Sequence, residues 1–336
     1  MREGASGVSP RSAGRGLETT PRAVARTVAP AKVNLYLGVR AGRDGRGYHR
    51  VDSLMCALEL HDDVEVEFAD DAGIELACDA SPTPDPRSNL AFRAAESLLA
   101  AWGVEQGLRI RLVKRVPSQA GLGGGSSDAA AVLRCLCALR DKVGGARSRG
   151  AGAEGRGDAA SADPTAFEVA RSLGADVPFF LGDRPCMLGG LGDEPRRRYG
   201  HLALPVTLAR PDGGVPTPAA YRAFDSDPVP PADPVALMSA LDRGDARGVI
   251  AGASNNLTRA ACSVQPLVAD TLSLLRSLAL PGEGVLLCGS GSACALFARD
   301  EARAARVAEA CRAAGLWSCA TATVGSDWAR PEVSVA

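Results

Sequence analysis

A glycine-rich stretch, PSQAGLGGGSSDAAAVLR from Pro117 to Arg134, carries the residue types that bind phosphate. Glycine has no β-carbon, so its backbone can adopt positive φ angles and bring N–H groups close to an anion. Ser126, Ser127 and Asp128, three residue types common at helix N-caps, stand between the glycines and an alanine-rich run. This order predicts a helix N-terminus, with its partial positive charge, at the end of the loop. We therefore predict a polyphosphate cradle made of Pro117, Gly121, Leu122, Gly123, Gly124, Gly125, Ser126 and Ser127.

Two familiar nucleotide loops do not match this stretch. A P-loop has Lys and Ser/Thr directly after its last glycine, whereas Gly125 is followed by two serines and the next lysine is Lys142. The dinucleotide fingerprint needs a third glycine where Ser126 stands. The pattern therefore favours an ATP loop outside both classes. Its Ser126 or Ser127 hydroxyl would be within reach of a Mg²⁺ ion.

A lysine and an asparagine share one face of an early strand. In the segment TVAPAKVNLYLGV, Thr27 to Val39, alternate residues are apolar. Because side chains alternate between the two faces of a strand, this pattern places Lys32 and Asn34 together on the face opposite the apolar residues. A lysine in this position is either a solvated charge or a ligand for phosphate or substrate, and as a ligand it needs an acidic partner.

A candidate partner follows the next helix. Asp163 and Pro164 open an apolar helical pattern that Gly174 closes. Asp176 comes directly afterwards, two residues before Pro178. An Asp in this setting is commonly a turn residue. Here it stands between a buried-looking helix and two phenylalanines, so it is also a candidate for a fixed position in a cleft.

Composition limits the class of protein. The chain has 336 residues, 46% of them apolar, which is enough for two domains with cores of their own. A net charge of −1 gives no general attraction for nucleic acid, and we interpret the basic run Arg196 to Arg198 as a solvated turn. Ten cysteines without a CxxC pair predict reduced thiols in the cytoplasm. The sequence shows no membrane span or secretory signal.

The expected helices and strands predict an α+β fold with two domains. An Arg- and Ser-rich tail, 1–26, is expected to be disordered and resembles a plastid transit peptide only weakly. The N-terminal ATP-binding domain is expected at 27–200, with a mobile low-complexity insert at 144–162. The C-terminal domain, 201–325, contains a second glycine turn that either touches a ligand or makes a hairpin. A short tail, 326–336, ends the chain.

The glycine-rich stretch resembles the ATP-binding motif of the GHMP kinases. PAKVNLYL, RGYHRVDS, GADVPFFL, RPDGGVPTPAAY, ASNNL and GSGSACALFA narrow the likeness to the 4-diphosphocytidyl-2-C-methyl-D-erythritol kinases of the non-mevalonate isoprenoid pathway. The resemblance spans about Ala29 to Val324. It implies an N-terminal domain like ribosomal protein S5 domain 2 and a ferredoxin-like C-terminal α/β sandwich. It also implies that ATP, Mg²⁺ and a small-molecule substrate meet between them.

The resemblance assigns roles to individual residues. By position it makes Lys32 and Asp176 the catalytic pair for phosphorylation of the substrate's 2-hydroxyl. Asn34, Asp176 and Thr217 would contact the substrate. Tyr48 would stack on a cytosine ring, and His49 would bond the edge of that ring.

Some positions depart from the family pattern and some questions stay open. Arg46 and Gly47 stand between Asp44-Gly45 and the Tyr-His pair, and Asn256 stands where an acidic residue is common. A homoserine or mevalonate-type kinase is the alternative, and a catalytically dead regulator on the same scaffold is a third reading, which retention of Lys32 and Asp176 disfavours. Both a monomer and a homodimer are compatible with the sequence.

Overall fold

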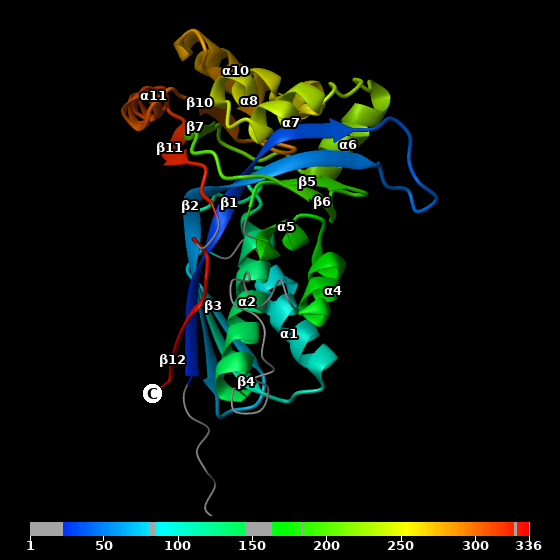
Figure 1. The fold of residues 1–336 in the computed structure, drawn as a ribbon, viewed down its shortest axis with the longest axis vertical. Coiled ribbons are helices and arrows are strands. Elements are labelled where there is room, and N and C mark those ends of the chain that lie inside the picture. The colour runs from blue at the N-terminus through cyan, green and yellow to red at the C-terminus, as the bar shows by residue number, and fades with distance from the viewer. Residues whose placement is uncertain (1–22, 81–84, 145–162, 183, 326–327, 336) are drawn as a thin grey trace, which may run out of the picture.

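The computed structural model describes residues 23–80, 85–144, 163–182, 184–325 and 328–335. Within these residues the chain forms two β-sheets with their helices, stacked along the long axis of the molecule (Figure 1). In the N-terminal half, the last strand of the first sheet ends at Arg198. The first strand of the second sheet begins at Pro205. No helix in the described part of the chain combines the length and the apolar run that a membrane crossing needs.

The first sheet contains strands from both ends of the chain. They are β1 (Ala23–Val39), β2 (Val51–Ala69), β3 (Ile74–Cys78), β4 (Gly107–Val113), β5 (Cys186–Gly189), β6 (Glu194–Arg198), β8 (Ser254–Asn255) and β12 (Glu332–Val335). The main path runs β12–β1–β2–β4–β3, with β5 paired to β2, β6 paired to β5, and β8 beside β1. The pairs β3–β4 and β1–β8 are parallel, and the others are antiparallel. The basic run interpreted as a turn is therefore part of strand β6.

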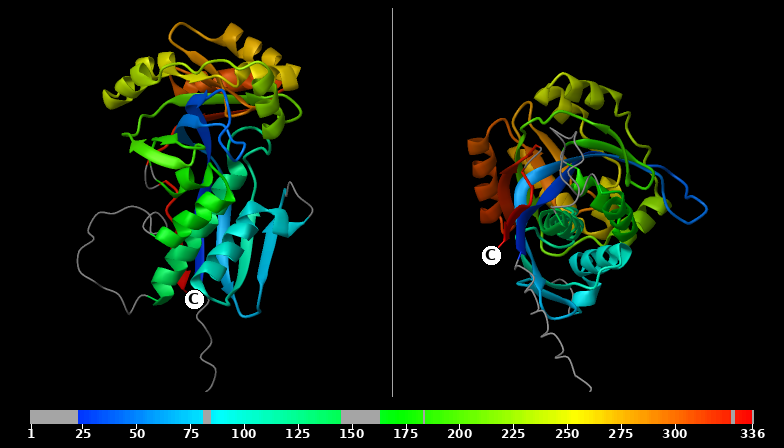
Figure 2. Two further views of the ribbon diagram at one scale, coloured as in Figure 1. Left: turned by 90° about the vertical axis from the view of Figure 1, so that its right-hand side faces the viewer. Right: turned by 60° about the horizontal axis from the view of Figure 1, so that its bottom comes forward.

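Helices cover one face of this sheet, as the left view of Figure 2 shows. They are α1 (Leu90–Trp102), α2 (Gly124–Gly144), α4 (Pro164–Leu173) and α5 (Val177–Leu181), with a 3-10 turn, η1 (Pro86–Ser88), before α1. Asn89 caps α1 by accepting a hydrogen bond from Ala91 N, and Gly103 ends it at a φ of 66°. Asp163 caps α4 in the same way. The start and end signals read from the sequence for α4, Asp163 and Gly174, are thus confirmed.

Strands β1 and β2 form a long hairpin that belongs to two cores. Near its open end, β2 packs against α2, and Val64 and Val66 belong to the first core. Nearer its closed end, Val33, Leu35 and Leu58 are fully buried against residues of the second sheet. Because one hairpin runs through both halves, any side chain that it presents at their junction is held on a rigid support.

The second sheet and its helices make the C-terminal half. Its strands are β7 (Pro205–Arg210), β9 (Gly284–Leu287), β10 (Cys294–Phe297) and β11 (Trp317–Ala322), and its helices are α6 (Thr217–Ser226), α7 (Val235–Asp242), α8 (Ala246–Gly252), α9 (Thr258–Val264), α10 (Pro266–Leu278) and α11 (Glu301–Ala313). The sheet order is β11–β7–β10–β9, with all pairs antiparallel. Numbered along the chain this order is 4-1-3-2, the ferredoxin-like arrangement that the sequence resemblance implied.

Both expected tails are shorter than the sequence suggested. Ala23 to Arg26, assigned to the 1–26 tail, lie in β1 and pair with β12, which itself lies within the expected 326–336 tail. The C-terminus therefore runs back beside the first strand, far from the C-terminal sheet (Figure 1). Small, fully buried Ala23 and Ala25 explain why this segment carried no strand signal. The rest of the N-terminal tail and 145–162 of the insert lie outside the described residues.

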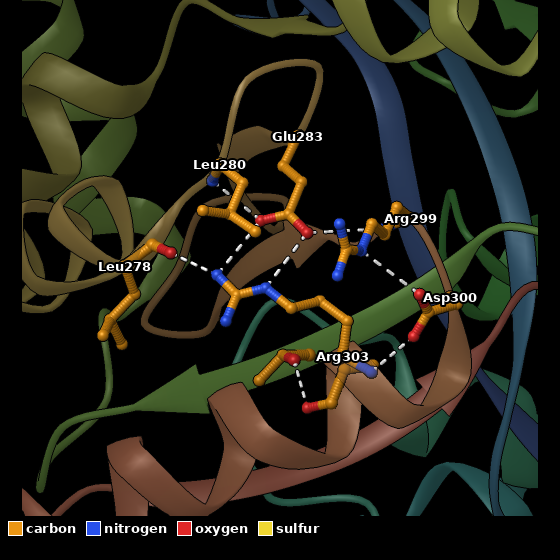
Figure 3. Close-up of polar contacts among 8 residues, drawn as sticks. Leu278, Leu280, Glu283, Arg299, Asp300 and Arg303 are labelled. Carbon is orange, nitrogen blue, oxygen red and sulfur yellow. Dashed lines mark hydrogen bonds and ion pairs between the residues drawn. The ribbon is translucent and has the colours of Figure 1, made fainter.

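A buried ion pair between Glu283 and Arg303 joins the end of α10, the turn before β9 and helix α11 (Figure 3). Glu283, just before β9, accepts hydrogen bonds from Arg303 Nε at 3.2 Å and from Leu280 N at 2.9 Å. Arg303 Nη2 also donates to Leu278 O at the end of α10. Asp300 caps α11 through Arg303 N at 2.7 Å. Burial alone would raise the pKa of Glu283, but these hydrogen bonds outweigh it and lower the pKa from its ordinary value of 4.5.

We expect Glu283→Ala to lower the free energy of unfolding by about 3 kcal/mol, because it leaves the buried Arg303 guanidinium without its counter-charge. Since the native pKa of Glu283 is lowered, this contribution is present above pH 4.5 and is lost as acidification protonates the carboxylate. Urea denaturation at neutral and acidic pH measures both effects. The matched variant Glu309→Ala, at an exposed site on α11, should change stability by less than about 0.5 kcal/mol. Equal effects of the two substitutions would contradict this role.

Candidate active site

A cleft of about 550 Å³ opens at the junction of the two halves. The predicted site residues in its wall are Lys32, Asn34, Pro117, Gly121, Leu122, Gly123, Gly124, Gly125, Ser126, Asp176 and Thr217. Ser127, Tyr48 and His49 are not in the wall. A separate cavity behind Phe179 has a volume of about 40 Å³, room for little more than a water molecule. A hollow of about 590 Å³ beside β3 and β4 is as large, but none of the predicted site residues line it. The cleft that gathers the predicted site residues is therefore the candidate site for a nucleotide and a second substrate.

The glycine-rich loop has the backbone geometry of a phosphate cradle. Gly121 and Gly123 have φ angles of 75° and 74°, in the left-handed region that favours glycine. A β-carbon on Gly123 would lie 3.0 Å from both the Lys32 side chain and the Phe180 ring. Leu122 O accepts a 2.9 Å hydrogen bond from Lys32 N, which fixes the loop against β1. Only glycine therefore allows the loop to run so close to the reactive lysine.

The helix after the loop begins earlier than the sequence suggested. Ser126 to Asp128 were expected to precede it as caps, but α2 begins at Gly124, so they lie in its first turn. Glycine is a poor helix former, so propensity hides a start at this position. The first N–H groups of α2 consequently come from Gly124 and its neighbours, which line the cleft.

The two candidate serines for Mg²⁺ lie in different surroundings. Ser126 lines the cleft, whereas Ser127 is fully buried. No cluster of three or more His, Cys, Asp or Glu side chains in the described residues is arranged to hold a metal. Mg²⁺ in nucleotide sites is held largely by phosphate oxygens and needs only one or two protein ligands. The donor set therefore fits a nucleotide-borne ion, and Ser126 is the better placed serine.

Lys32 is held by a short relay of hydrogen bonds along the hairpin. Its Nζ donates to Asn34 Oδ1 at 2.7 Å, and Asn34 Nδ2 donates to Ser53 Oγ at 2.8 Å. Ser53 Oγ in turn donates to Tyr36 O at 3.2 Å. The relay fixes which way the Asn34 amide points. Lys32 and Asn34 do project together, as the strand pattern predicted.

Asp176 faces Lys32 across the cleft. It immediately precedes α5, but its side chain makes no capping hydrogen bond, so the carboxylate is directed elsewhere. Its Oδ2 lies 3.5 Å from Lys32 Nζ, and its side chain remains 30% exposed, compared with 4% for Lys32. A buried ammonium thus meets a carboxylate that a ligand can still reach.

Tyr221 on α6 also lines the cleft and lies near enough to Asp176 to feel its charge. Burial, assisted by the charge of Asp176, raises the pKa of Tyr221 to about 12. Its phenol is therefore a neutral hydrogen-bond donor at physiological pH.

The second glycine turn both makes a hairpin and reaches the cleft. It connects β9 to β10, and Gly289 and Ser290 line the cleft wall. Asn255 Nδ2 supports the turn by donating to Gly289 O at 2.7 Å and to Leu287 O at 2.9 Å. Thr217, at the start of α6, shares a hydrogen bond with Ser290, with 2.9 Å between Thr217 Oγ1 and Ser290 Oγ.

The two glycine turns also touch each other. Ala293 N donates to Ala120 O at 3.0 Å, and a β-carbon on Gly121 would lie 2.0 Å from Cys288 O. The C-terminal half therefore forms the back of the phosphate cradle.

Tyr48 and His49 lie on the loop that joins β1 to β2, which projects from the molecule (Figure 1). Tyr48 is 58% exposed. The ring of His49 is buried, with Nδ1 3.0 Å from Arg40 O and Nε2 2.9 Å from Asp225 Oδ1. Arg43 pairs with the same Asp225 and bonds Gly47 O at 2.9 Å. The loop is thus fastened to α6, and the ring nitrogens of His49 face protein oxygens rather than the cleft.

Three residues important to this geometry were not singled out from the sequence: Ser53, Tyr221 and Asp225. Ser53 and Tyr221 stand inside the family motifs RGYHRVDS and RPDGGVPTPAAY, which was the available signal. Asp225 had none, because its partners are more than 170 residues away in the chain. At the variant position Asn256, the amide donates to Val39 O at 2.8 Å and Val229 O at 2.7 Å, which a carboxylate does not do.

Comparison with known proteins gives the family. Residues 89–181 match the GHMP kinases N terminal domain, and residues 237–315 match the GHMP kinases C terminal domain. A 4-diphosphocytidyl-2-C-methyl-D-erythritol kinase from Thermus thermophilus is 40% identical over 292 residues, which are 86% of this chain and 93% of that protein.

Solved structures agree. A crystal structure of 4-(cytidine 5'-diphospho)-2C-methyl-D-erythritol kinase matches with a TM-score of 0.70 and 37% identity, over 89% of this chain and all of that one. A homoserine kinase from Cytophaga hutchinsonii has a TM-score of 0.65 at 16% identity, over 96% of this chain and all of that one, and so shares the fold. The chain therefore belongs to the GHMP kinase family, and within it to the 4-diphosphocytidyl-2-C-methyl-D-erythritol kinases.

Proposed function

We propose that the chain transfers the γ-phosphoryl group of ATP to the 2-hydroxyl of 4-diphosphocytidyl-2-C-methyl-D-erythritol, a step of the non-mevalonate isoprenoid pathway. The observation that carries the proposal is the Lys32–Asp176 pair, 3.5 Å apart beside the glycine-rich cradle. A phosphate donor in the cradle and an alcohol at Asp176 would meet at Lys32.

In the proposed reaction Asp176 orients the acceptor hydroxyl and takes its proton. The acceptor oxygen forms a bond to the γ-phosphorus while the bond from that phosphorus to the β–γ bridging oxygen breaks, and ADP leaves. Lys32 neutralises charge on the transferring group, and Asn34 holds Lys32 in place through the 2.7 Å hydrogen bond. Most of the catalysis is thus positioning and charge neutralisation by side chains anchored on β1 and at the start of α5.

Mg²⁺ would be held mainly by the phosphates of ATP, with the Ser126 hydroxyl as the nearest protein ligand in the cradle. When bound, the ion shields phosphate charge. The glycine-loop N–H groups and the N-terminus of α2 orient the phosphates from the protein side.

Recognition of the cytidine half is assigned to the β1–β2 loop. Tyr48 presents an exposed ring that can stack on a base, and Thr217 lies in the cleft wall. For the ring of His49 to bond the base edge, it has to exchange its contact with Arg40 O or with Asp225 for one with the base.

We expect Tyr48→Ala to lower kcat/KM for the cytidine substrate by about ten- to a hundred-fold, because loss of one base stack costs about 1–3 kcal/mol. Steady-state kinetics should show an ATP KM that barely changes. Because the Tyr48 side chain is 58% exposed, the melting temperature of the variant protein should stay near that of the wild type. Tyr48→Phe keeps the ring and should behave as the wild type. A loss of stability without a selective effect on the cytidine substrate would show that Tyr48 only packs in its loop.

An acceptor panel tests the proposed function itself. Purified protein is incubated with Mg·ATP and, separately, the cytidine substrate, the unsubstituted methylerythritol phosphate, homoserine and mevalonate, and ADP release is followed. Release should be rapid with the cytidine substrate and slow with the other three. Preference for homoserine or mevalonate would favour the alternative of another small-molecule GHMP kinase.

We place the reaction in the cytoplasm. The ten cysteines are all free thiols in the structure, as is usual for proteins of a reducing compartment. The residues that we assign to catalysis, Lys32 and Asp176, come from one chain, so the proposed reaction is compatible with a monomer or a homodimer.

A further inference from the structure

The two ends of the glycine-rich loop are tied together by a buried cluster that has no part in the proposed chemistry. On the entry side, Asp62 of β2 accepts hydrogen bonds through Oδ1 from Arg115 N at 2.5 Å and from Val116 N at 2.8 Å. These are the two residues that precede Pro117. One carboxylate oxygen thus holds the backbone where it enters the loop.

Lys114 connects this entry to the exit of the loop. Its Nζ donates to Asp62 Oδ2 and, at 2.5 Å, to Asp128 Oδ2 in the first turn of α2. The side chains of Asp62, Lys114 and Asp128 are 0%, 8% and 3% exposed. The ammonium therefore joins strand β2 to helix α2 directly beneath the loop.

The space around Gly124 shows how closely the two ends approach. A β-carbon on Gly124 would lie 3.0 Å from Val116 Cγ1 and 3.6 Å from Lys114 Nζ. Lys114 and Asp128 also line the cleft. Any change in the separation of Lys114 and Asp128 would therefore move the first turn of α2 relative to the loop entry, and with it the phosphate-binding N–H groups.

The charge state of the cluster is unusual. Burial, together with the charge of Asp62, outweighs the effect of Lys114 and raises the pKa of Asp128 to about 7. Burial lowers the pKa of Lys114, but the two carboxylates raise it above its ordinary value. Cys78 of β3 and Asp79 also face the cluster. Burial thus weakens the preference of Asp128 for its charged form. What Lys114 needs from this position is an oxygen acceptor of the right size, which Asp128 Oδ2 provides.

We infer that Asp62, Lys114 and Asp128 are positioning residues for ATP, which hold the entry and the exit of the glycine-rich loop at the separation that the triphosphate requires. The inference rests on the proposed ATP-dependent reaction. It makes no claim on the alcohol acceptor, which meets Asp176 and Lys32 instead. Loss of the cluster should therefore weaken the binding of ATP and leave the binding of the alcohol acceptor unchanged.

The test compares two substitutions at one site. Asp128→Ala removes the acceptor and should raise the ATP KM about ten-fold, a size typical of residues that orient a ligand-binding group. The KM for the alcohol acceptor and kcat at saturating ATP should stay within about two-fold. Asp128→Asn keeps an oxygen of the same size and should retain an ATP KM within about two- to three-fold of the wild type. Binding of ATP alone, measured by calorimetry, should weaken in the same order.

Glu283→Ala is the control for a general loss of stability, because it breaks a buried ion pair far along the chain in the other half. It should lower the melting temperature without changing the ATP KM. The inference is overturned if Asp128→Ala leaves the ATP KM unchanged, raises both KM values equally, or if Glu283→Ala also raises the ATP KM. Wild-type protein that binds ATP but releases no ADP with any acceptor would contradict the proposed function and leave calorimetric ATP binding as the test of the cluster.

Discussion

Asp176→Asn should lower kcat about 100- to 10,000-fold, the range usually lost with a general base, while ATP binding stays within a few-fold of the wild type. The substitution keeps the size of the side chain but removes its negative charge and its ability to accept a proton. Asp176 does not cap α5 and its side chain is 30% exposed, so the melting temperature should change little. Single-turnover kinetics and calorimetry with ATP measure the two effects separately.

The control is Asp270→Asn, an exposed aspartate on α10 that should have wild-type kinetics. Turnover of Asp176→Asn close to that of the wild type would remove Asp176 from the reaction. A loss of ATP affinity as large as the loss of turnover would instead make Asp176 a nucleotide ligand.

Gly121→Ala should lower kcat/KM for ATP about 100-fold, because a shift of about 1 Å in a reacting group can have an effect of this size. A β-carbon at this position would lie 2.0 Å from Cys288 O, so the loop and the second glycine turn cannot keep their present contact. The φ of 75° adds backbone strain. Steady-state kinetics with ATP as the varied substrate measure the effect.

Gly282→Ala separates strain from collision. Gly282 has a φ of 88°, but no other atom lies within 4 Å of its β-carbon position. This variant should therefore lose some stability and keep its ATP kinetics. If Gly121→Ala behaves in the same way, the contact between the two glycine turns is not needed for ATP.

Local signals in the sequence were sufficient for much of the fold. In β4 the buried Leu108, Ile110 and Leu112 alternate with arginines, as the strand period requires, and cap residues mark both ends of α1 and α4. Helix α10 begins at a proline, and its buried Val268, Leu272 and Leu275 recur at helical spacing. In these elements one sequence signal specifies one local structure, so no knowledge of the tertiary contacts is needed.

Other elements depend on distant contacts. Helix α6 follows a proline-rich segment that reads as a turn, yet Phe224 is buried beside the β1–β2 hairpin. Strand β12 has little apolar character and exists because it pairs with β1 across the length of the chain. The early start of α2 at Gly124 is likewise held by the fold rather than by the helix propensity of glycine.

The same distinction applies to the site. The phosphate cradle could be predicted because its glycines, serines and helix are contiguous in the sequence. That Lys32 and Asp176 face each other came from the resemblance, since 144 positions separate them and spacing alone gives no contact. Ser53 and Tyr221 enter the site only because the hairpin and α6 meet there.

Phosphorus NMR of the reaction product tests the central claim most directly. The protein is incubated with Mg·ATP and 4-diphosphocytidyl-2-C-methyl-D-erythritol, and the product spectrum is recorded beside that of the Asp176→Asn reaction. We expect one new monoester phosphate without three-bond coupling to a proton, because the carbon at the 2-position carries no hydrogen, with the diphosphate intact, ADP in equal amount, and no product from the variant. A phosphate on another hydroxyl, a cleaved diphosphate, or an equal yield from the variant would contradict the account.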